Sequence, residues 1–501
     1  MRTRRTLTGR AAFAVAALAL VAACSGGGDI TDDGSGTGTT SPNTGEVTTN
    51  PGTAGESTTT IPADNLPDCP TDALASASGT VEIAFWHGMS GALGDELAKL
   101  TEAYNASQTK VHVSLVQGSY EETADNYYQA NQEDRPDIVQ LPEYQVQAMV
   151  DTASAIPVGT CVESSGYDIS KHLTAGLAAY ATGGVQWAIP FNISNPVLFY
   201  NEKAFAAAGL DPTKPPTSLD ELREFSQKIV DSGAAKFGLA LDSGFDSGGG
   251  WYVEQWFAKA GEFYADADNG RSGRATKVLY NNQTGVDLLT FLQGMINDGL
   301  AVDVGDNSQS GYDNLLKLAD DKEPAAMTIA TSASLGPVLQ VLASGQFPNV
   351  AADDVGVGPM PGPDGKPGAL IGGAALWMVN HDDPVRASAA WDFLTYLEGA
   401  QQQSDWAVAT GYVPVRTDAF DLEPYKSTVA ADPRFAVAYQ QLLDTPDAPT
   451  SAGPVLGPLR EVRTVLASAV ADIFGGADVK STLDAAANQS NGLIADYNAR
   501  N

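Results

Sequence analysis

The sequence predicts an α/β protein of two lobes joined by a hinge. At 501 residues the chain exceeds the roughly 250–300 residues at which a single core stops growing, so it can bury two cores. Between residues 80 and 141, strand and helix patterns alternate, which is typical of a parallel sheet with right-handed crossovers. The stretch Trp187–Asn201 joins two apolar runs through three small polar residues, Asn192, Ser194 and Asn195. We interpret this joint as a hinge crossing; an ordinary loop between strands is the alternative.

The N-terminus has the pattern of a secretory signal. Residues 1–23 begin with four arginines and continue into the apolar run Ala11–Ala23, which is too short to span a membrane stably. The run ends in VAAC, which resembles the bacterial lipobox, so we expect Cys24 to carry a lipid; cleavage after an alanine is the alternative. Residues 24–66 are rich in Gly, Ser, Thr and Pro and are predicted to be a disordered tether. The protein is therefore expected outside the cytoplasm, lipid-anchored to the outer face of the plasma membrane.

The charge balance limits the kinds of partner. The chain has 28 Lys and Arg residues against 61 Asp and Glu, a formal net charge of −33. Nucleic acid and anionic lipid need a basic patch, so both are excluded as partners apart from the lipid anchor. A small anion is compatible, because helix N-termini and one arginine can bind phosphate locally. Cys69 and Cys161 are available for a disulfide in an oxidising compartment.

The first lobe shows its alternation clearly. In parallel sheets, ligands bind beyond the carboxyl ends of strands, and Trp86–Gly91 and Glu143 occupy such positions. The expected elements are the strand Thr80–Trp86, a helix with Leu93, Leu97, Leu100 and Tyr104 on one face, the strand Val111–Val116, a helix from Tyr120 and the strand Asp137–Leu141.

The second lobe and the returns between lobes follow. Thr331–Ser334 leads into a helix near Leu335 and offers hydroxyls and free N–H groups to an anion, although a plain N-cap is the alternative. The other expected elements are a helix capped by Ser218 and Glu221, the strand Phe237–Leu241, the helix Gly285–Asn297, the strand Ala325–Ala330, a return through Val355–Pro361 and Ala369–Val379, the helix Pro384–Leu397 and two helices after Gly457.

Motifs for catalysis, metals and cofactors are missing. The four histidines stand alone, and the sequence has no HExxH, no GxSxG and no P-loop. We therefore expect no catalytic residue, metal or cofactor. Unpatterned carboxylates such as Glu143 keep a hydrolase open as an alternative.

Four phrases carry a resemblance to a known family. WHGMSGALG, PFNISNPVLFYNEKAFAAAGLDP, IGGAALWMV and TGYVPV look like the extracellular solute-binding proteins of ABC importers, and among these they most resemble the sn-glycerol-3-phosphate-binding proteins. The similarity runs from about Val81 to the C-terminus. It implies a type II periplasmic-binding-protein-like fold with a ligand cleft between hinge-linked lobes. Lobe 1 would comprise 67–192 and about 356–398, and lobe 2 would comprise 193–355 and about 399–501.

The resemblance also implies a ligand site. Glu143 would accept hydrogen bonds from glycerol hydroxyls and lie away from the phosphate, because like charges repel. Arg463 would bind the phosphate through two parallel hydrogen bonds. The full implied set is Tyr120 and Glu143 on the glycerol hydroxyls, Trp251 on the glycerol carbons, and Ser194, Thr331, Gly373, Tyr412 and Arg463 on the phosphate.

One departure from the family suggests a broader ligand range. Similar proteins carry a second aromatic residue shortly before Trp251, where this chain has Gly248. A missing side chain there would enlarge the glycerol end of the cleft, so we expect tolerance of glycerophosphodiesters such as glycerophosphocholine. A tryptophan at Gly248 would then weaken diesters selectively.

The leading hypothesis is a monomeric binding protein that hands a small phosphorylated polyol to two ABC permease subunits. Two alternatives stay open. A hydrolase would use Glu143 with a second carboxylate. An oligosaccharide-binding protein would stack sugars on aromatic side chains, for which the candidates are Trp86, Trp187, Trp251 and Trp256.

Overall fold

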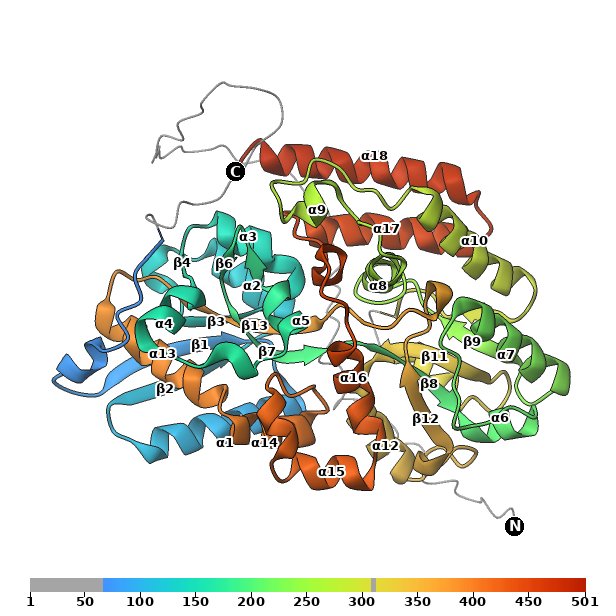
Figure 1. The fold of residues 1–501 in the computed structure, drawn as a ribbon, viewed down its shortest axis with the longest axis horizontal. Coiled ribbons are helices and arrows are strands. Elements are labelled where there is room, and N and C mark those ends of the chain that lie inside the picture. Colours follow the sequence, from blue (N-terminus) through green and yellow to red (C-terminus); the bar gives the residue numbers. More distant parts are fainter. Residues whose placement is uncertain (1–65, 308–311) are drawn as a thin grey trace, which may run out of the picture.

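The computed structural model describes residues 66–307 and 312–501, which form two lobes, each built on a β-sheet with helices packed against it (Figure 1). We call the part built on the six-stranded sheet lobe 1 and the part built on the five-stranded sheet lobe 2. The predicted signal peptide, the lipid-bearing Cys24 and the tether up to residue 65 lie outside the described residues. In the part of the chain that the structure describes, no helix is long and apolar enough to cross a membrane.

The lobe 1 sheet is parallel where strand–helix alternation predicted it and antiparallel where later segments join. β1 pairs in parallel with β2 and β3, whereas β13 runs antiparallel to β3, β4 and β7. In spatial order the strands are β2 (Val111–Gln117), β1 (Val81–His87), β3 (Ile138–Pro142), β13 (Gly372–Val379) and β4 (Ala155–Ile156), with β7 (Ile189–Ser194) also on β13 and a separate hairpin of β5 (Ala181–Thr182) and β6 (Val185–Gln186).

Helices cover both faces of this sheet. Phe85 of β1 packs with Leu97 and Phe393 on one face, whereas its neighbour Trp86 packs with Tyr127 on the other, as alternation along a strand requires. The helices of lobe 1 are α1 (Gly91–Ser107), α2 (Tyr120–Gln129), α3 (Val146–Asp151), α4 (Val158–Ser165), α5 (Thr174–Ala179), α13 (Pro384–Leu397) and α14 (Ala400–Thr410).

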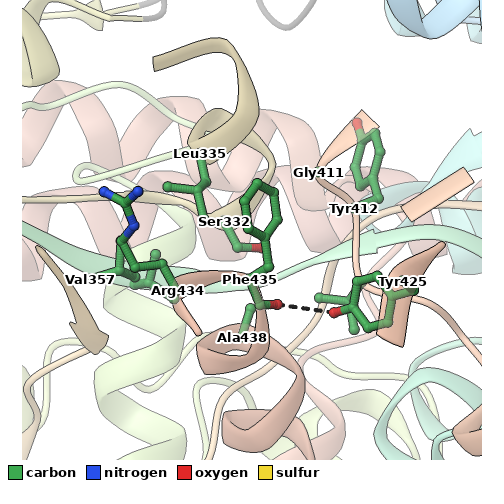
Figure 2. A pocket seen from close by; sticks show the side chains of 11 residues that line it. Ser332, Leu335, Val357, Gly411, Tyr412, Tyr425, Arg434, Phe435 and Ala438 are labelled. Carbon is green, nitrogen blue, oxygen red and sulfur yellow. Dashed lines mark hydrogen bonds between the residues drawn. The ribbon is translucent and has the colours of Figure 1, made fainter. Parts of the chain in front are cut away.

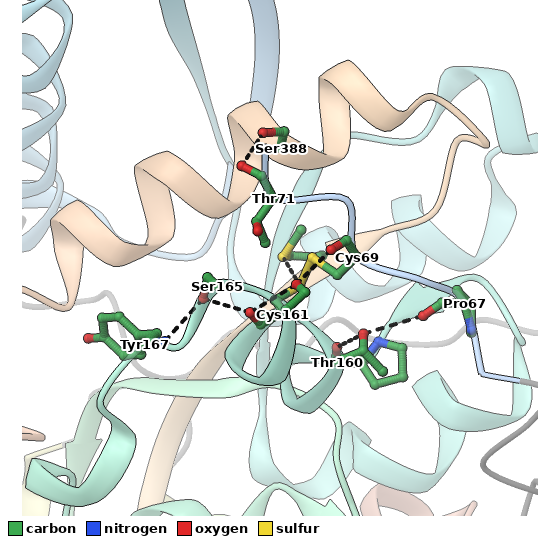
Figure 3. The surroundings of a disulfide bond; sticks show 11 residues. Pro67, Cys69, Thr71, Thr160, Cys161, Ser165, Tyr167 and Ser388 are labelled. Atoms are coloured by element: carbon green, nitrogen blue, oxygen red, sulfur yellow. Dashed lines mark hydrogen bonds between the residues drawn. A yellow bond between two sulfur atoms is a disulfide. The ribbon is translucent and has the colours of Figure 1, made fainter. Parts of the chain in front are cut away.

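A disulfide fastens the start of the described chain to lobe 1 (Figure 3). It joins Cys69 to Cys161 of α4, 92 residues away, with their Cα atoms 4.9 Å apart. The hydroxyl of Ser164 donates to the Cys69 carbonyl at 2.7 Å, and the hydroxyl of Thr160 donates to the Pro67 carbonyl at 3.3 Å. The disulfide and these two hydrogen bonds therefore hold the segment before β1 against α4.

The lobe 2 sheet combines parallel and antiparallel pairs around a buried centre. β11 pairs in parallel with β9 and antiparallel with β8, and β8 also pairs antiparallel with β12. Every residue of β11 except the last is buried, which explains its unbroken apolar sequence. In spatial order the strands are β10 (Ala301–Asp303), β9 (Phe237–Leu241), β11 (Ala325–Thr331), β8 (Pro196–Asn201) and β12 (Val355–Pro359).

The helices of lobe 2 include those predicted from Ser218, near Gly285, near Leu335 and after Gly457. Ser218 and Glu221 form the expected capping box of α7, and α17 and α18 lie side by side at the top of Figure 1. The helices are α6 (Glu202–Ala207), α7 (Leu219–Ser232), α8 (Trp251–Ala260), α9 (Asp266–Gly270), α10 (Gln283–Asn297), α11 (Asp313–Leu316), α12 (Leu335–Ala343), α15 (Tyr425–Ala431), α16 (Arg434–Leu443), α17 (Leu459–Phe474) and α18 (Val479–Asn498).

The first crossing between the lobes is shorter than the polar joint that we expected. Only Asn195 separates β7 from β8; Asn192 and Ser194 belong to β7, so the interpretation of these two as a loop is wrong. Their polar side chains fit a buried strand because each has a partner. Asn192 accepts a hydrogen bond from Gln140 at 2.7 Å, and Ser194 accepts one from Thr331 at 2.9 Å.

Two lobe boundaries also differ from the expected ones. The sequence assigned residues 356–398 to lobe 1 and 399–501 to lobe 2. In the structure β12 pairs with β8 in the lobe 2 sheet, and α14 packs against α1 in lobe 1. The ring of Trp406 in α14 lies 4.8 Å from that of Phe191, which anchors α14 in the lobe 1 core. An apolar strand and an amphipathic helix can each serve either lobe, so the pattern alone left the choice open.

Candidate functional site

The start of β13 is the point around which the candidate residues gather. Gly372 pairs with Ser194 of β7, and Gly373 pairs with Ile193. Gly373 has a φ of 93°, a backbone conformation that favours glycine. A Cβ atom there would also lie 2.0 Å from the carbonyl oxygen of Asn192. Only glycine fits at residue 373, as expected where chains approach closely.

Two hydroxyls and a tyrosine adjoin these glycines. Thr331 ends β11, and its Oγ1 donates to Ser194 Oγ at 2.9 Å. Tyr412 is buried and precedes Val413, whose N–H donates to the Ile193 carbonyl at 2.9 Å. Four predicted phosphate ligands therefore come from four chain segments that meet at the crossing: Ser194, Thr331, Gly373 and Tyr412.

A small pocket beside the crossing belongs to the packing of the hinge (Figure 2). It is lined mainly by apolar side chains such as Leu335 and Phe435, and the Tyr425 hydroxyl donates to the Phe435 carbonyl at 3.0 Å. The Arg434 guanidinium in its wall is already paired with Asp432 at 2.6 Å. We therefore do not assign an anion to this pocket.

Arg463 of α17 reaches across from lobe 2 between two carboxylates. Its Nε and Nη2 donate to the two oxygens of Glu254, on α8, at 2.6 and 2.8 Å. Its Nη1 donates to Glu143 Oε1, at the end of β3 in lobe 1, at 2.9 Å. The sequence did not predict this contact between Glu143 and Arg463, which brings the carboxylate expected on the glycerol hydroxyls to the arginine expected on the phosphate.

The charges of these three groups depend on one another. Burial alone would lower the pKa of the Arg463 guanidinium, but the charges of Glu254 and Glu143 raise it above its usual range. Burial raises the pKa of Glu143, and the positive charge of Arg463 counteracts that rise. Arg463 is thus always a cation, whereas the charge of Glu143 is open to titration.

Tyr120, at the start of α2, is held by a chain of polar contacts from lobe 1. Asn192 Nδ2 donates to the Tyr120 hydroxyl at 2.6 Å, and Gln140 Nε2 donates to Asn192 Oδ1 at 2.7 Å. The Tyr120 ring also packs on Gly88, where a Cβ atom would lie 2.5 Å from ring carbon Cδ1. The orientation of this phenol is therefore set before any ligand binds.

Trp251 opens α8 and packs against the glycines of β13. A Cβ atom on Gly372 would lie 2.4 Å from Cζ2 of the indole. The indole is 5% exposed, and its Nε1 has no hydrogen-bond acceptor among the described residues. A buried N–H without a partner destabilises a fold, so an acceptor on a ligand would satisfy this group.

A groove runs between the lobes beside Glu143 and Arg463. It has a volume of about 440 Å³. Its walls come from both lobes, with Tyr144 and Gln145 on one side and Pro458 and Arg460 on the other. The Arg463 guanidinium carbon lies 5.5 Å from the centre of the Tyr144 ring. The groove thus lies between the lobes, next to the bond by which Arg463 of lobe 2 reaches Glu143 of lobe 1.

The prediction that Gly248 enlarges the glycerol end of the cleft is wrong. A Cβ atom at this residue would lie 1.9 Å from the carbonyl oxygen of Asp242, and the Gly248 N–H donates to Asp242 Oδ1 at 3.1 Å. The position therefore points into the backbone of its own loop and not into the cleft. The Gly248→Trp test is unsuitable, because the loop would have to rearrange to accept any side chain.

Three partners of the candidate residues were not predicted from the sequence. Glu254, Asn192 and Gln140 orient Arg463 and Tyr120. Glu254 follows Trp251 by three residues, a spacing that puts both on one face of α8. That spacing was the one available signal, and it gains meaning only once Arg463 is known to lie opposite.

Residues 99–436 match the family of bacterial extracellular solute-binding proteins. The sn-glycerol-3-phosphate-binding periplasmic protein UgpB of Pectobacterium atrosepticum is 28% identical over 436 residues, which cover 84% of this chain and 93% of that protein. UgpB of Yersinia pseudotuberculosis is 29% identical over 430 residues, or 83% of this chain and 92% of that protein.

Solved structures share the fold at lower identity. UgpB from Mycobacterium tuberculosis in complex with glycerophosphocholine has a TM-score of 0.66 at 22% identity, covering 84% of this chain and 100% of that one. The sugar-binding protein MalE of Xanthomonas citri has a TM-score of 0.68 at 15% identity, covering 83% and 98%. Proteins of one architecture thus bind phosphorylated polyols in one case and sugars in another.

Proposed function

Because this chain belongs to the bacterial extracellular solute-binding proteins, we propose that its ligand is sn-glycerol-3-phosphate or a glycerophosphodiester such as glycerophosphocholine. The chain has the two-lobe fold of periplasmic solute-binding proteins. Proteins of this family bind a small solute and interact with the permease subunits of an ABC importer; they are not enzymes. The hydrolase alternative is therefore wrong.

The proposal rests on two neighbouring features: small polar groups at the start of β13, and a buried arginine that is bonded to Glu143 at the end of the adjoining strand β3. Arg463 supplies the positive charge, while Ser194, Thr331 and Tyr412 supply hydroxyls beside Gly373. A phosphate has several oxygens to satisfy, and a guanidinium with several hydroxyls and an N–H suits them. The curated relatives at 28–29% identity are named for sn-glycerol-3-phosphate, which agrees with this chemistry.

The sugar alternative has less support in the structure. Sugar rings need exposed aromatic faces, yet Trp187 and Trp256 are 4% and 1% exposed and belong to the cores. Their indole N–H groups donate to the carbonyls of Thr182 and Pro361. Of the four candidate platforms, these two cannot stack on a sugar, and an oligosaccharide needs no buried Arg463.

The test is calorimetry on the purified protein with sn-glycerol-3-phosphate, glycerophosphocholine and maltose in parallel. We expect tight binding of a phosphate ligand and no heat from maltose. Replacing Arg463 by alanine should abolish that binding, because the phosphate loses the guanidinium that supplies its charge-assisted hydrogen bonds. Binding of maltose alone, or unchanged affinity in Arg463→Ala, would refute the phosphate ligand.

We further propose that the protein is a monomer, anchored through lipid on Cys24 and the tether that follows. Family membership already places it outside the cytoplasm. Replacing Cys24 by alanine should release the protein from the membrane fraction into the soluble one. Unchanged membrane association of the variant would refute the lipid anchor.

A further inference from the structure

Glu254 occupies one whole edge of the Arg463 guanidinium. Its two oxygens accept from Nε and Nη2 at 2.6 and 2.8 Å, and both side chains are 2% exposed. A guanidinium has five N–H groups. Two bonds to Glu254 and one to Glu143 leave one N–H on each terminal nitrogen. A ligand can therefore bind the guanidinium only through the remaining N–H groups of Nη1 and Nη2, and it must approach between two carboxylates.

The charge around this end is negative before a ligand arrives. Arg463 contributes one positive charge, whereas Glu254 and Glu143 contribute two negative charges when both are ionised. Asp246 adds a third carboxyl close enough for its titration to respond to Arg463. The positive charge that a phosphate would meet is thus more than compensated by the protein itself.

We propose that Glu254 is a specificity-determining residue, which makes the site favour a singly charged phosphodiester over a doubly charged phosphate monoester. This inference rests on the proposed function, that the ligand carries a phosphate. A monoester bears a charge of about −1.5 to −2 at pH 7, while a diester bears −1. The two buried carboxylates would repel the additional charge of the monoester. We expect the dissociation constant of the monoester to exceed that of the diester by about tenfold or more, the order of magnitude for charges a few ångströms apart near a protein interior.

A purely structural role for Glu254 makes a different prediction. If its carboxylate only holds Arg463 in place, loosening it should weaken every phosphate ligand by the same factor. If it sets the charge that the site accepts, removing its charge should help the monoester relative to the diester. The ratio of the two dissociation constants separates these roles.

The experiment compares sn-glycerol-3-phosphate with its methyl ester, a diester of nearly the same shape without a second charged group. Calorimetry at pH 7.5 gives both dissociation constants for wild-type protein and for Glu254→Gln, which keeps the size of the side chain. We expect the ratio of monoester to diester constants to fall about tenfold in the variant. Glu262→Gln, an exposed residue just beyond α8, is the matched control and should leave the ratio unchanged. An unchanged ratio in Glu254→Gln would overturn the inference.

A second measurement needs only wild-type protein, in case the variant folds poorly. The monoester loses its second charge near pH 6. Between pH 7.5 and 5.5 its affinity should approach that of the methyl ester. Burial raises the pKa of Asp242 to about 6 and that of Asp246 to about 7, and it also raises the pKa of Glu143. Protonation of these carboxyls removes negative charge around the site, so it moves the ratio in the same direction as protonation of the monoester itself. A ratio independent of pH would overturn the inference, whereas binding of neither ester would refute the proposed function itself.

Discussion

Two arginines of lobe 2 both reach lobe 1, Arg463 fully buried and Arg271 half-buried, and their contacts differ in kind. Arg463 lies between two carboxylates and keeps two N–H groups for a further partner. Arg271, just after α9, donates instead to backbone carbonyls of lobe 1, among them Ala178 at 2.8 Å and Ala181 at 2.7 Å. It also donates to Gly453 at 2.8 Å, so it ties three chain segments together.

The comparison shows that burial alone does not identify a ligand-binding arginine. Burial lowers the pKa of Arg271 to about 10, because carbonyl dipoles replace water without a compensating negative charge. Its five hydrogen bonds account for all five N–H groups. Arg463 has excess negative charge and unused donors. We infer that an arginine with unused N–H donors is a candidate for ligand binding, whereas one whose N–H groups are all bonded within the protein has a structural role.

The loop that presents Arg271 is itself unusual. Three consecutive residues other than glycine, Ala267, Asp268 and Asn269, have positive φ angles between 51° and 63°. Such a stretch is unfavourable unless surrounding contacts enforce it. The Asn269 side chain accepts from the N–H groups of Tyr264 and Ala265 at 2.7 and 2.9 Å. The contacts of Arg271 and Asn269 together hold this turn in place.

The largest effect should come from replacing Arg271 by methionine. Hydrogen bonds to charged groups contribute roughly 1.5–3 kcal/mol each, and five carbonyls would lose a shared donor, so we expect a loss of about 3 kcal/mol or more in the free energy of unfolding. Urea unfolding followed by circular dichroism measures it. The folded fraction should still bind ligand, because Arg271 has no N–H group left for one. A loss of binding at full folding would contradict the role of clamp.

Replacing Arg463 by methionine should also destabilise the protein, but in a manner that depends on pH. Without the guanidinium, Glu254 and Glu143 are buried anions, and burial raises the pKa of Glu143 further once its cation is gone. A carboxyl whose pKa is higher in the folded state than in the unfolded state favours folding as pH falls. The deficit relative to wild type should therefore shrink between pH 8 and 5.

Arg271→Met serves as the control for that pH dependence. Backbone carbonyls do not titrate, and the pKa of Arg271 near 10 lies far above this range. Its deficit should stay constant from pH 8 to 5, measured by the same urea titrations. Parallel pH profiles for the two variants would show that the carboxylates beside Arg463 are already neutral in the folded protein.

The sequence predicted the helices and strands better than it predicted which lobe each of them joins. Apolar periodicity predicted α1, β2 and α7 because each side chain pattern has one consistent period. The family resemblance brought out eight candidate residues, and several of them lie at or beside the start of β13. A pattern along the chain does not show which distant segments pack or pair with each other. The pairing of β12 with β8, the packing of α14 on α1 and the bond between Glu143 and Arg463 each join residues far apart in the chain.

The same reason explains why the role of Gly248 was mispredicted. A glycine in a Gly-rich run looks like a missing side chain, and only the direction of its absent Cβ shows otherwise. That direction depends on how the loop folds back on Asp242, whose carboxylate accepts from Gly244, Ser247 and Gly248. The sequence shows that residue 248 is a glycine, but only the structure shows in which direction a side chain there would point.

The smallest effect should come from a third contact between the lobes, at the rim of the groove. Arg274 donates to both oxygens of Asp151 at 3.0 and 2.6 Å, and the Tyr497 hydroxyl donates to the same carboxylate at 2.9 Å. The Arg274 side chain is 19% exposed and that of Asp151 only 6%, so water screens this pair little. Asp151→Asn keeps one oxygen that can accept from Arg274 or Tyr497, so it should lower the free energy of unfolding by about 1–2 kcal/mol. The contact lies between lobes, so breaking it should raise the dissociation constant of the ligand several-fold by favouring the open arrangement. Calorimetry on Asp151→Asn, with the exposed rim variant Glu461→Gln as control, measures this shift. Unchanged affinity would contradict this prediction and show that the contact between Arg274 and Asp151 does not contribute to closure.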